Sequence, residues 1–279
     1  MSVATVTSPR VRRPELFRSG RGLAGVSILI AMLLLVVVGP LLAPHDPTAT
    51  SGDTGAGPSS AHLLGTDTLG RDIFSRVLSG GGTVIGLPLV AVVIGLTIGA
   101  TIGILAGYLG GPLDAVATRV FDVQLAIPGI LLALLIVTGF GRGDGVVVAA
   151  VALVEIPRFA RVLRPATQSV AARDYVLAAR ARGEGLRWIV FGEILPGVLP
   201  TFLTEAALGL TAAVLAIASL SFLGLGVQQP TPNWAVMVSE NRELLFTHPF
   251  GGVIVPALLM ALLAIGINLT VDAMTRSGA

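Results

Sequence analysis

Few side chains in this sequence of 279 residues could carry covalent or metal chemistry. There is no cysteine, which excludes disulfides, thiolate metal ligands and cysteine nucleophiles. There is also no lysine, so all 18 basic residues are arginine, and the chain cannot contain a P-loop, which requires a lysine. The histidines His45, His62 and His248 are far apart in sequence, and a nickel site formed by them is an alternative that we do not adopt. We therefore assign no catalytic residue, no cofactor bound by this chain and no metal ligand.

The charged residues form two groups that favour structural roles. Asp67 and Asp72 flank Arg71 in a turn-rich segment, where the carboxylates can cap helical turns and the arginine can pair with either. Direct contact of this group with a substrate is the alternative. Glu155 and Arg158 are three residues apart and share one face of a predicted helix. Because more arginines follow them, we interpret the two as an ion pair at the cytoplasmic interface.

The elements that position these residues are predicted to be membrane-spanning helices and the loops between them. The chain is 53% hydrophobic, its mean hydropathy is +0.87, and only 12% of its residues are charged. Soluble domains carry about 25% charged residues, and a helix needs about 20 apolar residues to cross a bilayer. The sequence predicts six spans, namely Leu23–Leu42, Val84–Leu109, Val123–Phe140, Gly145–Val162, Ala206–Val227 and Phe250–Val271.

The distribution of arginine predicts that both termini are cytoplasmic, because cytoplasmic segments carry the excess of basic residues. With this topology, 14 of the 18 arginines lie inside, and only Arg71, Arg76, Arg142 and Arg242 lie outside. The first span is longer than a signal-peptide core, so we expect a retained anchor. The chain divides into a cytoplasmic tail 1–21, a first transmembrane helix 22–43, an external loop 44–83 and a five-helix core 84–279. The segment Thr48–Ser60 predicts a flexible linker.

The loop 163–201 is the longest predicted cytoplasmic segment. A short helix is predicted to begin at Asp174, as N-cap, and to end before Gly183, a natural C′ residue. A second helical stretch, Leu186–Leu195, is predicted to stop at Pro196. An isolated helix this short is marginal, so we weigh two interpretations equally: a docking element and a solvated connector.

Glycine recurs every four residues in the second predicted span, at Gly95, Gly99, Gly103 and Gly107. Small residues at this spacing let helices approach closely in lipid. The spacing predicts helix packing, either within the chain or against a partner.

The cytoplasmic loop resembles the "EAA" loop of ABC importer permeases, which forms the helix that docks into the ATPase. The resemblance rests on Ala178 and Ala179, then Gly183, then Ile194–Pro196, and Leu177 replaces the usual glutamate. It implies an ATPase-coupling site made of Asp174, Tyr175, Leu177, Ala178, Ala179, Arg180, Arg182, Gly183, Ile194, Leu195 and Pro196.

Two further segments resemble one subfamily, the dipeptide/oligopeptide/nickel importer permeases. The first comprises Ala43–Pro47 (APHDP) and His62–Arg76 (HLLGTDTLGRDIFSR), and its start is typical of the second of the two permease subunits. The second is Ser221–Trp234 (SFLGLGVQQPTPNW), which we also interpret as an interfacial loop with Trp234 at headgroup level. The residues of the external motif are Gly65, Thr66, Asp67, Gly70, Arg71, Asp72 and Arg76.

The resemblance implies an all-α membrane protein with six transmembrane helices and the fold of ABC type I importer permeases. Its implied location is the bacterial plasma membrane. The implied partners are a homologous second permease, two ATP-binding subunits that hold ATP and magnesium, an extracytoplasmic binding protein that delivers peptides, and membrane lipid, but no nucleic acid. The chain itself is then not an enzyme, and its substrate-binding residues are unknown. Nickel or another small solute is the alternative cargo, and an ion-coupled secondary transporter or a membrane-embedded enzyme is the rival class.

Overall fold

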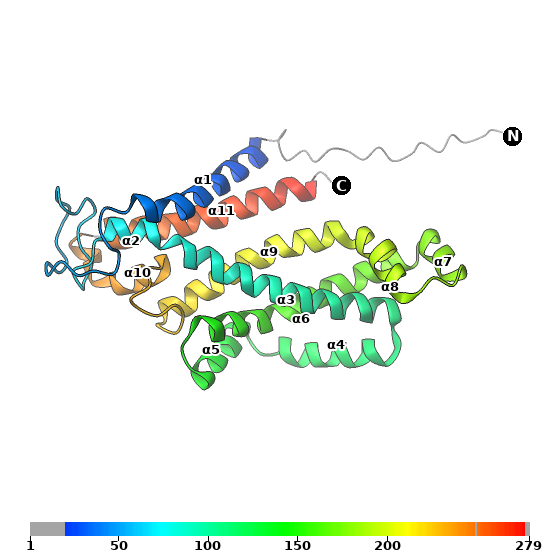
Figure 1. The fold of residues 1–279 in the computed structure, drawn as a ribbon. Helices are drawn as coiled ribbons and strands as arrows, with labels where there is room; N and C mark the ends of the chain where they lie inside the picture. Colours follow the sequence, from blue (N-terminus) through cyan, green and yellow to red (C-terminus); the bar gives the residue numbers. More distant parts are fainter. Residues whose placement is uncertain (1–19, 249, 277–279) are drawn as a thin grey trace.

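The structure, a computed structural model, describes residues 20–248 and 250–276 (Figure 1). Within this part every regular element is a helix, and the two β-bridges are isolated. The tail arginines Arg10, Arg12, Arg13 and Arg18 lie outside the described residues. The elements are α1 Gly20–Leu42, α2 Ile73–Ser79, α3 Gly81–Leu109, α4 Gly111–Leu125, α5 Gly129–Phe140, α6 Asp144–Ala171, α7 Asp174–Ala181, α8 Leu186–Trp188, η2 Ile189–Ile194, α9 Leu195–Phe222, α10 Trp234–Glu240, η3 Arg242–Phe246, η4 Phe250–Ile254 and α11 Val255–Arg276.

The helices long and apolar enough to cross a membrane number four in the described part, or five if one bent pair counts as a span. The bent pair is α4 with α5, whose axes meet at 84°. By length and composition, residues 20–248 and 250–276 therefore contain four or five candidate spans, whereas the sequence predicts six. The four are Gly20–Leu42, Ile73–Leu109, Leu186–Phe222 and Phe250–Ala273.

Two of the predicted spans differ from the structure for identifiable reasons. The stretch Val123–Phe140 is not one helix, because Pro128 has no N–H to donate and disfavours helical backbone at Ile127. The stretch Gly145–Val162 does lie within one helix, α6, but α6 is not among the four apolar spans. It continues to Ala171 and carries Glu155 and several arginines.

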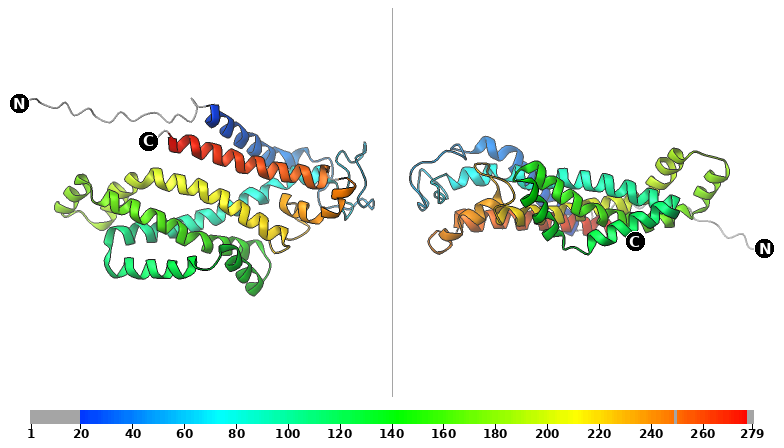
Figure 2. Two further views of the ribbon diagram at one scale, coloured as in Figure 1. Left: turned by 180° about the vertical axis from the view of Figure 1, so that it is seen from behind. Right: turned by 90° about the horizontal axis from the view of Figure 1, so that it is seen from below.

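The helices form an elongated bundle (Figure 1). Helices α3, α6 and α9 pack against one another in its middle, and α1 packs along α11 on one flank. Helices α4 and α5 lie on the opposite flank, as Figure 2 shows from behind. One end of the bundle carries α7 and is called the α7 end; the other carries α2, α10 and the loop between α1 and α2 and is called the loop end. Helix α1 begins, and α11 ends, toward the α7 end (Figure 1).

The buried side chains form two clusters. The larger fills the space between α3, α6 and α9, where Phe159 and Leu220 are fully buried. The smaller joins α1, α2, α10 and α11 around Met32, Trp234 and Met237. Many large apolar side chains on the outer faces are exposed, which is the pattern of a chain whose outer surface meets lipid or other subunits.

Trp234 does not lie at a surface, although the sequence predicts a headgroup anchor. Its side chain is fully buried, and its Nε1 donates a hydrogen bond of 2.8 Å to the carbonyl oxygen of Val77. The prediction was wrong because α10 packs against α9 and α11 and places the ring against Gly80 and Gly81, where α2 meets α3.

The glycines of α3 lie against α6, within the chain. A Cβ added at Gly95, Gly99, Gly103 or Gly107 would approach a carbonyl oxygen of α6 at 3.0, 2.5, 2.7 or 2.6 Å, respectively. The four oxygens belong to Ala152, Ile156, Ala160 and Arg164, which follow the same four-residue spacing. The two helix backbones therefore approach so closely that any larger residue at these positions would force them apart.

The sequence predicts that the helical stretch Leu186–Leu195 stops at Pro196, but it does not stop there. The helical path runs from Leu186 through the π-helical turn η2 into α9, and Pro196 occupies the first turn of α9. Proline is tolerated there because the π-helical turn η2 interrupts the α-helical hydrogen-bond pattern directly before it.

Candidate functional site

Helix α7 and the turn after it form a small element at the α7 end. Asp174 lies in the first turn, and the N-cap is Arg173 rather than Asp174. Gly183 has a φ of +77°. Its N–H donates a hydrogen bond of 3.0 Å to the carbonyl oxygen of Arg180, and the N–H of Glu184 donates one of 3.2 Å to the carbonyl oxygen of Ala179. These two bonds make a Schellman cap, which requires a left-handed residue at the position of Gly183.

One face of α7 is fixed to the bundle and the other is open. Val176 and Ala179 are fully buried and pack toward α6 and η2. Tyr175 and Leu177 remain 41% and 47% exposed, and Ala178 is exposed beside them. Helix α7 is therefore packed against the bundle on one face and has a partly apolar, exposed face on the other.

Arginines surround this open face. Arg180 stacks over the ring of Tyr108, with 5.4 Å between its Cζ and the ring centroid, which ties α7 to the end of α3. Arg182 pairs with Glu184 at 2.6 Å and is more than half exposed. A partner surface with apolar and acidic groups would complement this face.

Not all of the residues predicted to couple to an ATPase lie on the open face. Ala179 is buried inside the chain, and Ile194 is fully buried where η2 meets α9. Leu195 and Pro196 belong to the first turn of α9. The open face therefore consists of Asp174, Tyr175, Leu177, Ala178, Arg180 and Arg182, and the other predicted residues do not lie on it.

A buried charge network occupies the loop end. The Nε of Arg71 lies 2.6 Å from Asp67 Oδ2, and its Nη2 lies 2.6 Å from Glu240 Oε2. Arg76 is fully buried and lies 3.5 Å from the same Asp67 oxygen and 3.2 Å from the same Glu240 oxygen. Two arginines are thus compensated by two carboxylates, so the predicted anchoring role agrees with the geometry. Glu240 belongs to α10, so its ion pairs with Arg71 and Arg76 connect α10 to the start of α2.

The segment 48–60 is bound to the motif rather than free. Ser51 N–H donates to the carbonyl of Gly70, Gly55 N–H donates to that of Asp67, and Thr66 N–H donates to that of Ala56. A Cβ at Gly65, where φ is +81°, would lie 2.3 Å from the carbonyl oxygen of Ala56. The composition predicts a flexible linker, but these hydrogen bonds depend on residues of the motif and cannot be inferred from composition.

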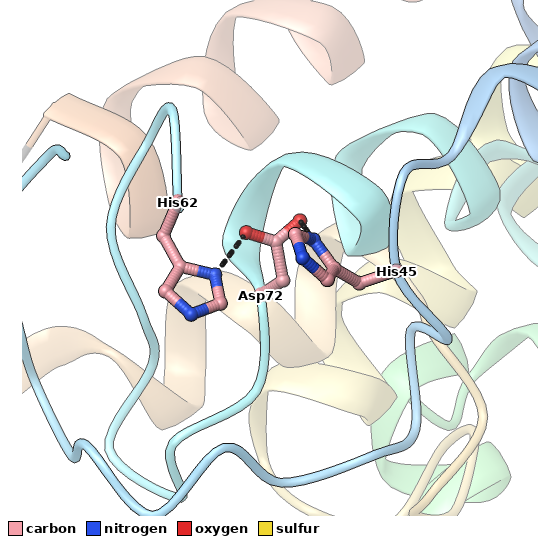
Figure 3. Close-up of side chains that lie close together, drawn as sticks. All are labelled: His45, His62 and Asp72. Atoms are coloured by element: carbon pink, nitrogen blue, oxygen red, sulfur yellow. Dashed lines mark hydrogen bonds and ion pairs between the residues drawn. The ribbon is translucent and has the colours of Figure 1, made fainter. Parts of the chain in front are cut away.

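Asp72 is the N-cap of α2, as the sequence predicts. Its Oδ2 accepts hydrogen bonds from the N–H and Oγ of Ser75 at 2.8 and 2.6 Å. Its Oδ1 lies 2.9 Å from Nδ1 of His62, and His45 approaches from the other side (Figure 3). Burial alone would raise the pKa of Asp72, but the hydrogen bonds from Ser75 and His62 outweigh it and lower the pKa below its ordinary value.

A second charge cluster lies between α6 and α9. Arg158 Nη1 lies 2.9 Å from Glu155 Oε2, which agrees with the pair expected from their spacing. Arg158 Nη2 also lies 3.5 Å from Oε2 of Glu205. Glu155 lines a pocket of about 360 Å³ with Ser219 and apolar residues of α5, α6 and α9.

Sequence reasoning missed the roles of Glu240 and Glu205. Each completes a charge cluster with an arginine that is 47 or more positions earlier in the chain. The only available signal was that buried arginines must be paired, which shows that a carboxylate is needed but not which one.

The chain matches known proteins over nearly all of its length. Residues 99–277 match the family of binding-protein-dependent transport system inner membrane components, and residues 12–58 match the N-terminal transmembrane domain of oligopeptide transport permease C. A dipeptide transport system permease protein of Alkalihalophilus pseudofirmus is 35% identical over 270 residues, covering 96% of this chain and 88% of the relative. A glutathione transport system permease protein of Pectobacterium atrosepticum is 41% identical over 216 residues, covering 77% and 71%. A di/tripeptide transport system permease protein of Pseudomonas aeruginosa is 35% identical over 257 residues, covering 90% and 84%.

Proposed function

Because the chain belongs to the family of binding-protein-dependent transport system inner membrane components, which are permease subunits of ABC importers, we propose that it forms half of a translocation pathway for peptides. Three relatives named for dipeptide, di/tripeptide and glutathione transport support peptides as the cargo. A homologous permease would form the other half, and an extracytoplasmic binding protein would deliver the peptide. Two partner subunits would bind ATP and magnesium and hydrolyse ATP.

In the proposed topology the α7 end is cytoplasmic and the loop end faces outward. The excess of arginine in α6, α7 and the turn after it supports this orientation. We propose six crossings, in which the bent pair α4–α5 and then α6 provide the third and fourth. The position of α6 between α3 and α9, with its charges Glu155 and Arg158 paired, supports its placement in the membrane.

The observation that carries the proposed mechanism is the mounting of α7. Its buried face is held by α6 and η2, so a force applied to its open face would reach α6 and α9 through packed side chains. We propose that an ATP-binding subunit holds the open face and that its closure rocks the bundle between inward-open and outward-open states.

Two glycines near this turn provide a matched test of the mechanism. Gly183 has a φ of +77° and Gly185 a φ of −71°, and a Cβ would meet nothing within 4 Å at either. Gly183→Val should therefore strain the turn by roughly 1–2 kcal/mol, while Gly185→Val should not. We expect Gly183→Val to lose most uptake of a labelled dipeptide by cells that contain the whole importer. Equal uptake by the two variants would show that the turn does not transmit motion.

Contact with the ATP-binding subunit can be tested by cross-linking, because the chain has no cysteine of its own. Ala178→Cys and Arg182→Cys place thiols on the open face and should cross-link to that subunit in the assembled importer. Ala179→Cys is buried and Ser60→Cys lies at the loop end, so neither should. If Ser60→Cys captures the ATP-binding subunit, the proposed orientation is reversed. If no exposed position of α7 cross-links in a complex that still transports, α7 is only a connector.

A further inference from the structure

Three potential metal ligands that are distant in sequence meet at the loop end. His45 follows α1, His62 lies in the loop, and Asp72 begins α2 (Figure 3). Each offers one ligand atom, and these atoms all lie within 4.8 Å of one another. His62 Nδ1 is 2.9 Å from Asp72 Oδ1, and His45 Nδ1 is 3.6 Å from Asp72 Oδ2. The two imidazole rings are 5.0 Å apart and tilted by 41°.

The spacing of these atoms suits a small divalent ion. Bonds of about 2.0–2.2 Å in a tetrahedral site place neighbouring ligand atoms roughly 3.3 Å apart. The observed distances of 2.9 Å to Oδ1 and 3.6 Å to Oδ2 of Asp72 lie on either side of that value. Because no two of the three ligand atoms are more than 4.8 Å apart, side-chain rotations that bring them closer by up to about 1.5 Å would form the site. Two imidazoles and one carboxylate, without any thiolate, are ligands typical of zinc and other late first-row transition metals.

Other contacts hold the three ligands in place. Ser75 donates two hydrogen bonds to Oδ2 of Asp72, which orients the carboxylate. The backbone N–H of His45 bonds to the Oγ of Ser75 at 3.1 Å, and that of His62 bonds to the Oγ of Ser59 at 3.0 Å. The group is thus organised before any ion binds.

The three side chains differ in their exposure to solvent. The side chain of Asp72 is only 2% exposed and that of His62 15%, whereas that of His45 is 43% exposed. An ion could therefore enter past His45 and keep an open coordination position for water, while the carboxylate beneath it is shielded.

We propose that His45, His62 and Asp72 form a binding site for one divalent transition-metal ion, of which Zn²⁺ is the best match. For Nδ1 of His62 to bind the ion, the neutral imidazole carries its proton on Nε2, so the contact of Nδ1 with Asp72 gives way to a contact of both groups with the ion. The ion joins the segment after α1 to the start of α2 and so closes the loop between them. This site is independent of the proposed transport function, because neither the ligands nor the test involves a peptide or ATP.

The test uses the full chain in detergent, carrying a purification tag without histidine and stripped of metal with a chelator. Titration with Co²⁺ should give saturable visible absorption of a low-coordinate site at one ion per chain, and Zn²⁺ should displace it because Zn²⁺ binds such ligands more tightly. Calorimetry with Zn²⁺ supplies the dissociation constant. If the wild-type chain shows no stoichiometric site by either method, the proposal is wrong.

Glutamine variants separate ligation from structure. In His62→Gln the amide can still donate a hydrogen bond to Asp72, so the cap of α2 is kept while the imidazole is lost. We expect His62→Gln and His45→Gln each to weaken Zn²⁺ binding by roughly tenfold or more, and the double variant to lose the site. His248→Ala, an exposed histidine outside the group, should bind as the wild type does. Undiminished binding by the double variant, or loss of binding in His248→Ala, would refute the assignment.

Discussion

The contact between α3 and α6 allows a graded prediction from four glycines of one helix. The Cβ of an alanine at position 99 would lie 2.5 Å from the carbonyl oxygen of Ile156 and 2.9 Å from Cβ of Phe159. Ordinary contact begins at 3.4 Å, so Gly99→Ala must move the helices apart by about 0.9 Å. At Gly95 the corresponding distance is 3.0 Å, and the required shift is about 0.4 Å.

The expected loss of stability follows from this overlap. Inserting a methyl group into a close-packed interface costs roughly 1–3 kcal/mol. Alanine also favours a helix over glycine by about 1 kcal/mol, which offsets part of that loss. Gly86→Ala measures the second effect alone, because Gly86 lies in α3 and a Cβ there meets nothing within 4 Å.

We expect the melting temperature of the purified chain in detergent to fall in the order Gly86→Ala, Gly95→Ala, Gly99→Ala, with the last clearly below the wild type. Gly99→Ala and Gly103→Ala together should cost less than the sum of the two, because a single separation of the helices relieves both overlaps. If Gly99→Ala and Gly86→Ala have the same melting temperature, the α3–α6 contact is not as close as described. Strict additivity of the two losses would show that the helices do not move as rigid bodies.

Three further predictions concern topology and the loop end. Reporter fusions after Arg276 and within the segment 48–60 should report opposite sides of the membrane, and the same side for both would exclude the proposed topology. Glu240→Gln removes a carboxylate that compensates two buried arginines and should lower the stability of the chain in thermal melts by about 3–5 kcal/mol; a loss below 1 kcal/mol would mean that the network is hydrated. Trp234→Phe leaves the buried carbonyl of Val77 without its donor and should cost roughly 1–3 kcal/mol in the same assay, while unchanged melting would show that water replaces the indole N–H.

Several parts of the fold could be predicted because they depend on neighbours in the sequence. The apolar runs of α1, α3, α9 and α11 identify membrane helices by composition alone. The cap made by Asp72 and the left-handed turn at Gly183 follow from the conformational preferences of single residues. The four-residue spacing of glycine in α3 predicts a close helix contact, although it does not say which helix fills it.

The parts that sequence reasoning missed depend on which segments meet in space. Pro196 stops a helix only if its position requires an N–H donor, and the π-helical turn before it removes that requirement. The burial of Trp234 depends on the packing of α10 against α9 and α11, which no local pattern encodes.

Helix formation and turn geometry depend on residues within about four positions of one another, so the amino-acid order alone predicts a helical membrane protein with a glycine-lined helix and the turn after α7. Other contacts become visible only in the folded chain: α6 packs against the glycines of α3, Glu240 pairs with Arg71 and Arg76, and His45 and His62 meet at Asp72. These contacts join residues between 10 and 169 positions apart. A buried charge requires an opposite charge, and a small residue in a helix allows another helix to pack closely. The packing of the helices determines which residue or helix meets that requirement.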